Sequence, residues 1–154
     1  QAAGRSRDEA RRRATDYLYA VGLDESFADR VPGCLSGGQR QRVSLALALA
    51  AEPALIIADE PTTALDVVAR AEILRLLRSL TSLPQGPALL LITHDLPAAA
   101  ICENIAVLHD GAIIESGETR PVLTRPEHPV TAAMCEAGAE ETIDGALAAA
   151  GAAA

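Results

Sequence analysis

The sequence predicts an α/β fold in which parallel strands with flanking helices are followed by a C-terminal β-hairpin. Two short apolar runs, 54–58 and 88–93, are separated by a helical stretch long enough for a parallel crossover. Two further apolar runs surround Asp110-Gly111, a dipeptide typical of hairpin turns. With 154 residues, the chain is long enough for one domain with its own core.

The N-terminal third is predicted to form two helices. The first covers residues 6–20, with Ser6 as its N-cap. The second runs from Ser36 to about residue 51, and Ser36 can cap it. Its distal half is apolar nearly all round, which predicts that this half is buried.

The middle of the chain reads as strand, helix, strand. The run 54–58 follows Pro53 and is apolar throughout, the pattern of a strand covered on both faces. Asp66 can cap a third helix, whose apolar residues recur at helical spacing until the proline-containing segment 84–87. The run 88–93 supplies a second buried strand.

The C-terminal part is predicted to contain short elements. A short helix over 96–102 precedes the hairpin strands 105–108 and 112–114, and another covers 119–125. From about residue 137 the sequence is rich in Ala and Gly, and we expect a low-complexity tail there.

Composition excludes several functions. The net charge of −8 disfavours nucleic acid as a partner. All 13 basic residues are arginines, so the chain cannot carry a G-x-x-x-x-G-K-[ST] phosphate loop. The longest apolar run, 45–51, is far shorter than the ~20 residues of a membrane-spanning helix. Three widely spaced cysteines indicate neither a disulfide framework nor a zinc site, which fits a reducing cytoplasm.

The first candidate site is the turn Ser36-Gly37-Gly38-Gln39 at the start of the second helix. A helix start exposes unpaired amides at a positive dipole end, and adjacent glycines let an anion approach the backbone. Ser36 adds a hydroxyl donor. This pattern suits a terminal phosphate, and its plain alternative is an ordinary Ser-capped helix after a glycine turn.

The second candidate site lies where the two predicted parallel strands end. Asp59 and Glu60 follow the first strand and His94 ends the second, at the edge where open α/β sheets bind ligands. One carboxylate can hold Mg²⁺ while its neighbour, pointing to the opposite side of the strand, activates water. His94 can donate to a phosphate oxygen. Asp66 can act as a helix cap, as a site residue, or as both.

These motifs occur in a fixed order and spacing: L-S-G-G-Q, then L-I-I-A-D-E, then A-L-D and I-T-H-D. In this order, over roughly residues 8–135, the chain resembles the nucleotide-binding subunit of ABC (ATP-binding cassette) transporters, whose fold is P-loop NTPase-like. The resemblance implies the signature motif at Leu35 to Gln39 and the Walker B strand at Leu55 to Asp59. It also implies the catalytic base at Glu60, the D-loop at Ala64-Leu65-Asp66 and the switch histidine at His94.

The resemblance also implies how the domain is organised. Residues 1–136 would be the C-terminal portion of an ABC ATPase domain, with 1–50 in its helical signature subdomain and 51–136 in its catalytic core. Residues 137–154 would form the tail. The family's phosphate loop lies upstream of the signature, so the chain is expected to be a C-terminal half that lacks it and has deficient activity alone.

Cofactors, partners and site residues follow from the same resemblance. The cofactors would be ATP and Mg²⁺. The partners would be a second nucleotide-binding subunit, in a head-to-tail dimer, and a transmembrane permease that holds the protein at the inner face of the cell membrane. The implied catalytic residues are Glu60 and His94, the metal ligand is Asp59, and the ATP-binding residues are Ser36, Gly37, Gly38, Gln39 and Asp66.

Within the family, the motifs are most similar to those of dipeptide, oligopeptide and nickel importers. The segment 126–131 resembles their P-x-H-P-Y-T segment, although Val130 replaces the usual tyrosine and Gly33-Cys34 stands where a His-Glu pair is frequent. The implied function is to energise the import of peptides or a related small solute. Two alternatives are a non-transport ABC-type ATPase and a catalytically inactive half-domain that binds an intact ATPase subunit.

Overall fold

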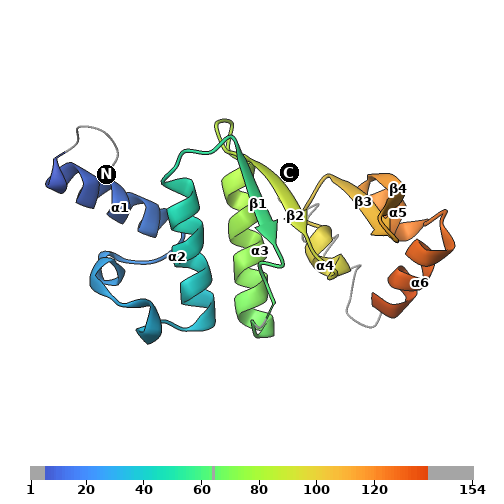
Figure 1. The fold of residues 1–154 in the computed structure, drawn as a ribbon, viewed down its shortest axis with the longest axis horizontal. Coiled ribbons are helices and arrows are strands. Elements are labelled where there is room, and N and C mark those ends of the chain that lie inside the picture. Colours follow the sequence, from blue (N-terminus) through green and yellow to red (C-terminus); the bar gives the residue numbers. More distant parts are fainter. Residues whose placement is uncertain (1–5, 64, 139–154) are drawn as a thin grey trace. The chain divides into compact units, whose positions relative to one another are not determined.

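The structure is a computed structural model that describes residues 6–63 and 65–138 (Figure 1). The chain divides into two compact units. The first comprises Gln1–Ile57 and Pro61–Leu90, and the second comprises Ala58–Glu60 and Leu91–Ala154. The expected boundary near residue 50, between a helical signature subdomain and a catalytic core, stays a prediction. The helix that begins at the signature packs against the helix that follows the first strand.

The first unit begins with two helices, α1 (Arg7–Ala20) and α2 (Gly37–Leu49), as predicted. Two short 3-10 turns, η1 (Glu25–Asp29) and η2 (Pro32–Cys34), connect them. Ser6 caps α1, since its side chain accepts a hydrogen bond from the Glu9 amide.

Helix α1 ends in a turn that requires glycine. Gly22 has a φ of +73° and donates its amide to the Tyr19 carbonyl. The Leu23 amide reaches back to the Leu18 carbonyl at 2.9 Å. This pair of bonds is the Schellman arrangement, which closes a helix and redirects the chain.

The prediction that the distal half of α2 is buried all round is wrong for Leu47. Leu45, Ala46 and Leu49 are buried, whereas Leu47 is exposed. Helices α1 and α3 pack against α2. Because successive residues are about 100° apart around a helix, Leu47 lies on the side away from Leu45, and no described element covers that side.

A parallel strand pair follows, formed by β1 (Leu55–Asp59) and β2 (Ala88–Ile92). At one end the Ala88 amide donates to the Ala54 carbonyl, and at the other the Glu60 amide donates to the Ile92 carbonyl, both at 2.9 Å. Both strands therefore run in the same direction, which confirms the predicted parallel pair.

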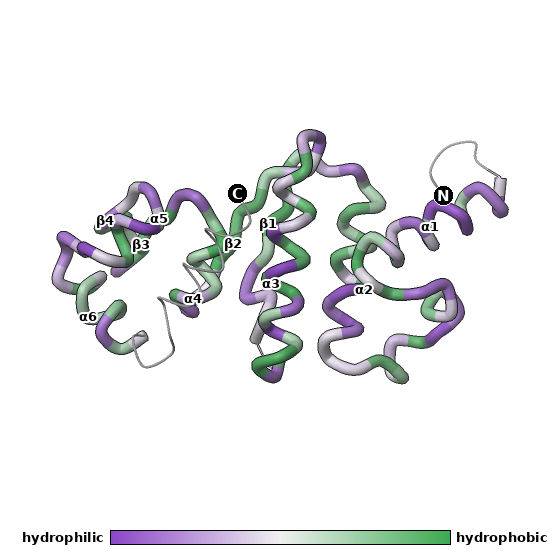
Figure 2. The backbone as a smooth tube through the Cα atoms, turned by 180° about the vertical axis from the view of Figure 1, so that it is seen from behind, coloured by the Kyte–Doolittle hydropathy of each residue, from purple (hydrophilic) through white to green (hydrophobic). Residues whose placement is uncertain are grey.

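The strands are covered on one face only, so the prediction of cover on both faces is wrong for the described residues. Ile56 is 7% exposed, whereas Leu55 and Ile57 are 48% and 62% exposed. Helix α3 (Val67–Thr81) lies behind β1 in Figure 1 and in front of it in Figure 2, where both strands appear largely apolar. A single helical layer can bury only the residues that alternate toward it.

The second unit is built from short elements: α4 (Leu96–Ala99), β3 (Asn104–His109), β4 (Ala112–Glu118), α5 (Thr119–Thr124) and α6 (Pro129–Gly138). The predicted helix over 96–102 is shorter than expected and continues as turns. The predicted hairpin is confirmed: β3 and β4 pair antiparallel around Asp110 and Gly111, whose φ values are +47° and +77°.

The sequence did not indicate α6. A carboxylate from the hairpin anchors its start, since Glu115 accepts hydrogen bonds from the amides of Glu127 and His128, at 2.9 and 3.1 Å. The hydrogen bond from the Glu127 amide is the main reason that the pKa of Glu115 is lowered. Helix α6 extends through Gly138, and the rest of the predicted tail, 139–154, lies outside the described residues.

The second unit has its own apolar core. Leu96, Ala100 and Leu123 form the buried centre, and Ile105, Met134 and Cys135 pack around them. Across the described ranges, no helix is both long and apolar enough to cross a bilayer.

Candidate functional site

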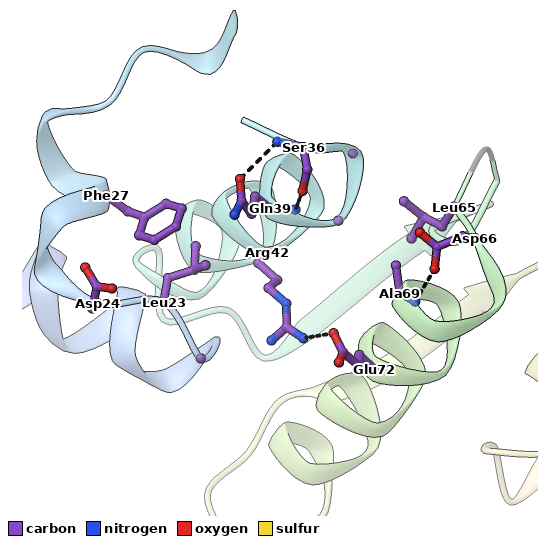
Figure 3. A pocket seen from close by; sticks show the side chains of 13 residues that line it. Leu23, Asp24, Phe27, Ser36, Gln39, Arg42, Leu65, Asp66, Ala69 and Glu72 are labelled. Atoms are coloured by element: carbon purple, nitrogen blue, oxygen red, sulfur yellow. Dashed lines mark hydrogen bonds and ion pairs between the residues drawn. The ribbon is translucent and has the colours of Figure 1, made fainter. Parts of the chain in front are cut away.

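The start of α2 is a capping box formed by the predicted signature residues. Ser36 Oγ accepts a hydrogen bond from the Gln39 amide at 3.2 Å, and Gln39 Oε1 accepts one from the Ser36 amide at 3.0 Å (Figure 3). The cap uses the acceptor sides of both groups. The hydroxyl hydrogen of Ser36 and the side-chain NH₂ group of Gln39 therefore remain able to donate hydrogen bonds to an anion.

A pocket of about 570 Å³ opens beside this helix start. One wall is the first turn of α2, a second follows the end of α1, and a third is the start of α3 (Figure 3). The lining residues that the following argument uses are Ser36, Gly37, Gly38, Gln39, Arg42, Leu65, Asp66, Ala69 and Glu72.

Asp66 faces the same pocket and caps α3. Its Oδ1 accepts a hydrogen bond from the Ala69 amide at 2.8 Å. The predicted capping role is therefore confirmed, and Asp66 lines the same pocket as the signature turn. Ala64, which precedes Leu65 in the predicted D-loop, lies outside the described residues.

Arg42 joins three elements at this pocket and was not singled out from the sequence. Its guanidinium donates to the Val21 carbonyl at 2.7 Å and to Glu72 Oε2 at 2.9 Å, and its side chain is only 19% exposed. A methyl group on Gly22 would lie 2.9 Å from its Nη1. Since Arg42 and Glu72 are thirty residues apart in the chain, no local pattern could have predicted their contact.

Asp59, Glu60 and His94 lie together in the second unit. Strand β1 ends at Asp59, which is exposed. Glu60 Oε1 accepts a hydrogen bond from the His94 amide at 3.1 Å and lies 2.7 Å from His94 Nδ1. The imidazole and the carboxylate therefore form a close pair at the ends of β1 and β2.

The sequence suggested that Asp59 and Glu60 point to opposite sides of one strand. In the structure β1 ends at Asp59, and Glu60 lies in the bend that follows it. Glu60 has a φ of +46°, a left-handed conformation that is rare outside glycine and costs about 1–3 kcal/mol. The hydrogen bond from its amide to the Ile92 carbonyl and its two contacts with His94 hold Glu60 in this conformation. Such strain is concentrated at functional positions in proteins.

The predicted site residues thus form two groups, one in each unit. Ser36 to Gln39 and Asp66 share the pocket of the first unit, and Asp59, Glu60 and His94 form the cluster of the second. Across residues 6–63 and 65–138, no three His, Cys, Asp or Glu side chains are arranged to hold a metal ion by themselves. The exposed Asp59 carboxylate fits Mg²⁺, which proteins commonly hold through one or two carboxylates and substrate phosphates.

Residues 2–63 match the family model described as ABC transporter. The probable D,D-dipeptide transport ATP-binding protein DdpD of Escherichia coli is 43% identical over 141 residues, covering 90% of this chain and 43% of DdpD. The methionine import ATP-binding protein MetN of Cereibacter sphaeroides is 45% identical over 130 residues, covering 84% of this chain and 36% of MetN.

Among solved structures, the ATP-binding cassette MJ0796 is similar, in a dimeric post-hydrolysis state bound to ADP and Pi. It is 39% identical with a TM-score of 0.67, covering 78% of this chain and 51% of the cassette. The fold is therefore that of part of an ABC ATPase. The chain thus contains part of an ABC transporter domain and is similar over most of its length to ATP-binding proteins of ABC transporters. It spans less than half the length of these curated relatives.

Proposed function

We propose that this chain is part of an ATP-hydrolysing subunit that powers the import of peptides or a related small solute through a membrane permease. The observation that carries the proposal is the Glu60–His94 pair at the ends of two parallel strands, with Asp59 beside it. The names of the relatives, which include dipeptide and methionine importers, support the solute class.

In this proposal, Asp59, Glu60 and His94 act on the nucleotide bound by their own subunit. Glu60 orients an attacking water and takes its proton, and Asp59 holds Mg²⁺, which offsets the charge of the phosphates. His94 fixes the Glu60 carboxylate through its backbone amide and its ring. With a proton on Nδ1 the ring donates a hydrogen bond to Glu60 Oε1 and so helps to hold the carboxylate in place.

Ser36, Gly38 and Gln39 would act on the nucleotide of a second subunit, in a head-to-tail dimer. Their donors bind the γ-phosphate of ATP, which ADP lacks after hydrolysis. ATP would thus favour the closed dimer, and hydrolysis would release it, because a ligand shifts an equilibrium only by its differential affinity. The dimer would lie at the inner face of the membrane, held by the permease.

The isolated chain would hydrolyse ATP poorly. A phosphate loop of the G-x-x-x-x-G-K-[ST] type places a lysine on the β- and γ-phosphates, and this chain has no lysine. Residues 1–136 would therefore supply a signature turn and an acid pair, with the phosphate cradle coming from elsewhere.

The test mixes the purified chain with an intact cassette, the dipeptide transport ATP-binding protein DppD of Escherichia coli. We expect the chain alone to show background magnesium-dependent phosphate release, and to bind DppD with ATP but not with ADP. Ser36→Ala should weaken the ATP-dependent binding, whereas Cys34→Ser, an exposed change two residues earlier, should not. Robust turnover by the chain alone would refute the deficiency, and equal binding with and without ATP would refute the role of the signature turn.

Glu60→Gln tests the base separately. Where the chain shares an active assembly, we expect phosphate release at the site that contains Glu60 to fall ~10²-fold or more, the usual contribution of a general base. Glu118→Gln, a matched change on the exposed end of β4, should leave the rate unchanged. An unchanged rate in Glu60→Gln would remove Glu60 from the reaction.

A further inference from the structure

The two glycines of the signature turn lie close to Leu65 and to the start of α3. A Cβ built on Gly37 would lie 3.3 Å from Leu65 Cδ2, and one on Gly38 would lie 3.4 Å from Ala69 Cβ. Neither glycine has a positive φ. Backbone conformation therefore does not require glycine at these positions, although each glycine costs a helix about 0.5–1 kcal/mol relative to alanine.

A side chain at Gly37 would crowd Leu65, in the segment that leads into α3. Of the two glycines, Gly37 has the tighter surroundings, because 3.3 Å is closer than nearly all real Cβ contacts, whereas 3.4 Å at Gly38 is an ordinary contact distance. Leu65 is half-buried and directly precedes Asp66, which caps α3. The side chain that meets Gly37 thus belongs to the segment that holds the Asp66 carboxylate in the pocket.

A second contact holds the same two helices further along. Arg42 lies on α2, and its bond to Glu72 on α3 is 2.9 Å long (Figure 3). The two helices are therefore related at two levels. Gly37 and Leu65 line the same pocket with little room between them, and the ion pair joins α2 to α3 further along. Two separated contacts fix the orientation of one helix on the other better than one.

We propose that Leu65 is a positioning residue that couples the signature turn to the Asp66 segment. Its side chain lies so near Gly37 that a methyl group there would crowd it, so a displacement of the turn would also displace Leu65 and the Asp66 cap. Gly37 then has a role besides letting an anion approach: it accommodates Leu65. That the displacement is driven by a γ-phosphate rests on the proposed function, whereas the contact itself does not.

A double-mutant cycle in the full chain tests the coupling without nucleotide. The variants are Gly37→Ala, Leu65→Ala and their combination, and the readout is hydrogen exchange of two amides. The Gln39 amide reports on the signature turn because Ser36 holds it, and the Ala69 amide reports on the α3 cap because Asp66 holds it.

We expect Gly37→Ala to accelerate exchange of both amides about fivefold, a ratio within the usual range of coupling between touching residues. In the Leu65→Ala background, the same change should no longer accelerate exchange, because the methyl it would meet is gone. Gly33→Ala is the matched control, since a methyl there meets nothing within 4 Å. It should leave both amides unchanged.

Two outcomes would overturn the proposal. Gly37→Ala could have the same effect with Leu65 present or absent, or it could change Gln39 exchange while Ala69 exchange stays constant. If Leu65→Ala does not fold, Leu65→Val completes the cycle, because it also shortens the side chain. Leu65→Met, which keeps the volume, should preserve wild-type exchange at both amides.

The binding assay with DppD gives a readout that a purely structural role would not move. We expect Gly37→Ala to lower the ATP-dependent part of the binding and Leu65→Ala to restore part of it in the double variant, while Gly33→Ala has no effect. Without that restoration, the contact would not serve nucleotide recognition. If the unmodified chain shows no ATP-dependent binding, the proposed function fails while the exchange cycle still decides the coupling.

Discussion

The parallel strands β1 and β2 and the hairpin β3–β4 differ in how the chain covers them. The hairpin is followed at once by α5 and α6, and residues of these elements and of α4 close a core around Leu123. Strand β1 is apolar on both faces, yet Leu55 and Ile57 remain exposed. Elements that are neighbours in sequence can build their own cover, whereas a parallel strand pair needs separate layers from distant parts of a chain.

The largest expected effect is a difference in stability between substitutions on the two faces of β1. Ile56→Ala should lower the free energy of unfolding by about 2–5 kcal/mol, because Ile56 is buried and its truncation leaves a cavity. Ile57→Ala, the same change at the next residue, should cost less than about 1 kcal/mol, because Ile57 is 62% exposed. Chemical denaturation of both variants measures the difference.

Equal losses in the two variants would contradict the one-sided cover. They would show that the exposed face of β1 is packed in solution as well as the face toward α3.

A smaller loss of stability is expected at the start of α2, which is capped by a side chain of the same turn. Ser36→Ala removes the acceptor for the Gln39 amide and should cost about 1 kcal/mol. Ser36→Thr keeps a hydroxyl acceptor and should retain most of that stability. Thermal unfolding checks both, and an unchanged midpoint in Ser36→Ala would mean that the capping box does not hold α2 in solution.

The smallest effect at neutral pH concerns the start of α6, where the stabilising carboxylate comes from the hairpin. The pKa of Glu115 is lowered from its ordinary value of 4.5, chiefly by the Glu127 amide. A carboxyl whose pKa is lowered by folding stabilises the protein above its ordinary pKa, and this stabilisation is lost as pH falls through the folded value. Glu115→Gln should therefore lower the unfolding midpoint at pH 7 and flatten its decline below about pH 4.5.

The control for Glu115→Gln is Glu118→Gln, which alters an exposed carboxylate on the same strand. It should keep the acid dependence of the unmodified chain. If Glu115→Gln kept that dependence too, Glu115 would not be the group that links α6 to the hairpin.

Local features of the fold were predictable from the sequence. Ser36 and Asp66 cap α2 and α3 as expected, and Asp110-Gly111 forms the hairpin turn. These features depend on residues within a few positions of one another, so their side-chain chemistry decides the outcome. The positions of Glu60 and His94 at the ends of two parallel strands were predictable for a related reason, since a parallel crossover brings like ends together.

Other features depend on which element lies against which. The sequence pattern of β1 could not show which face is covered. It gave no signal for the left-handed Glu60, for the Arg42–Glu72 ion pair, or for the Gly37–Leu65 contact. Each of these joins residues that local spacing does not relate.

The sequence by itself determined the order of the motifs and the residue types at the proposed nucleotide site, because these are carried by each short segment. The tertiary structure decided that the signature turn shares a pocket with Asp66, and that Glu60 is held by His94. Packing made these choices, since only contacts between distant segments fix the distance from one side chain to another.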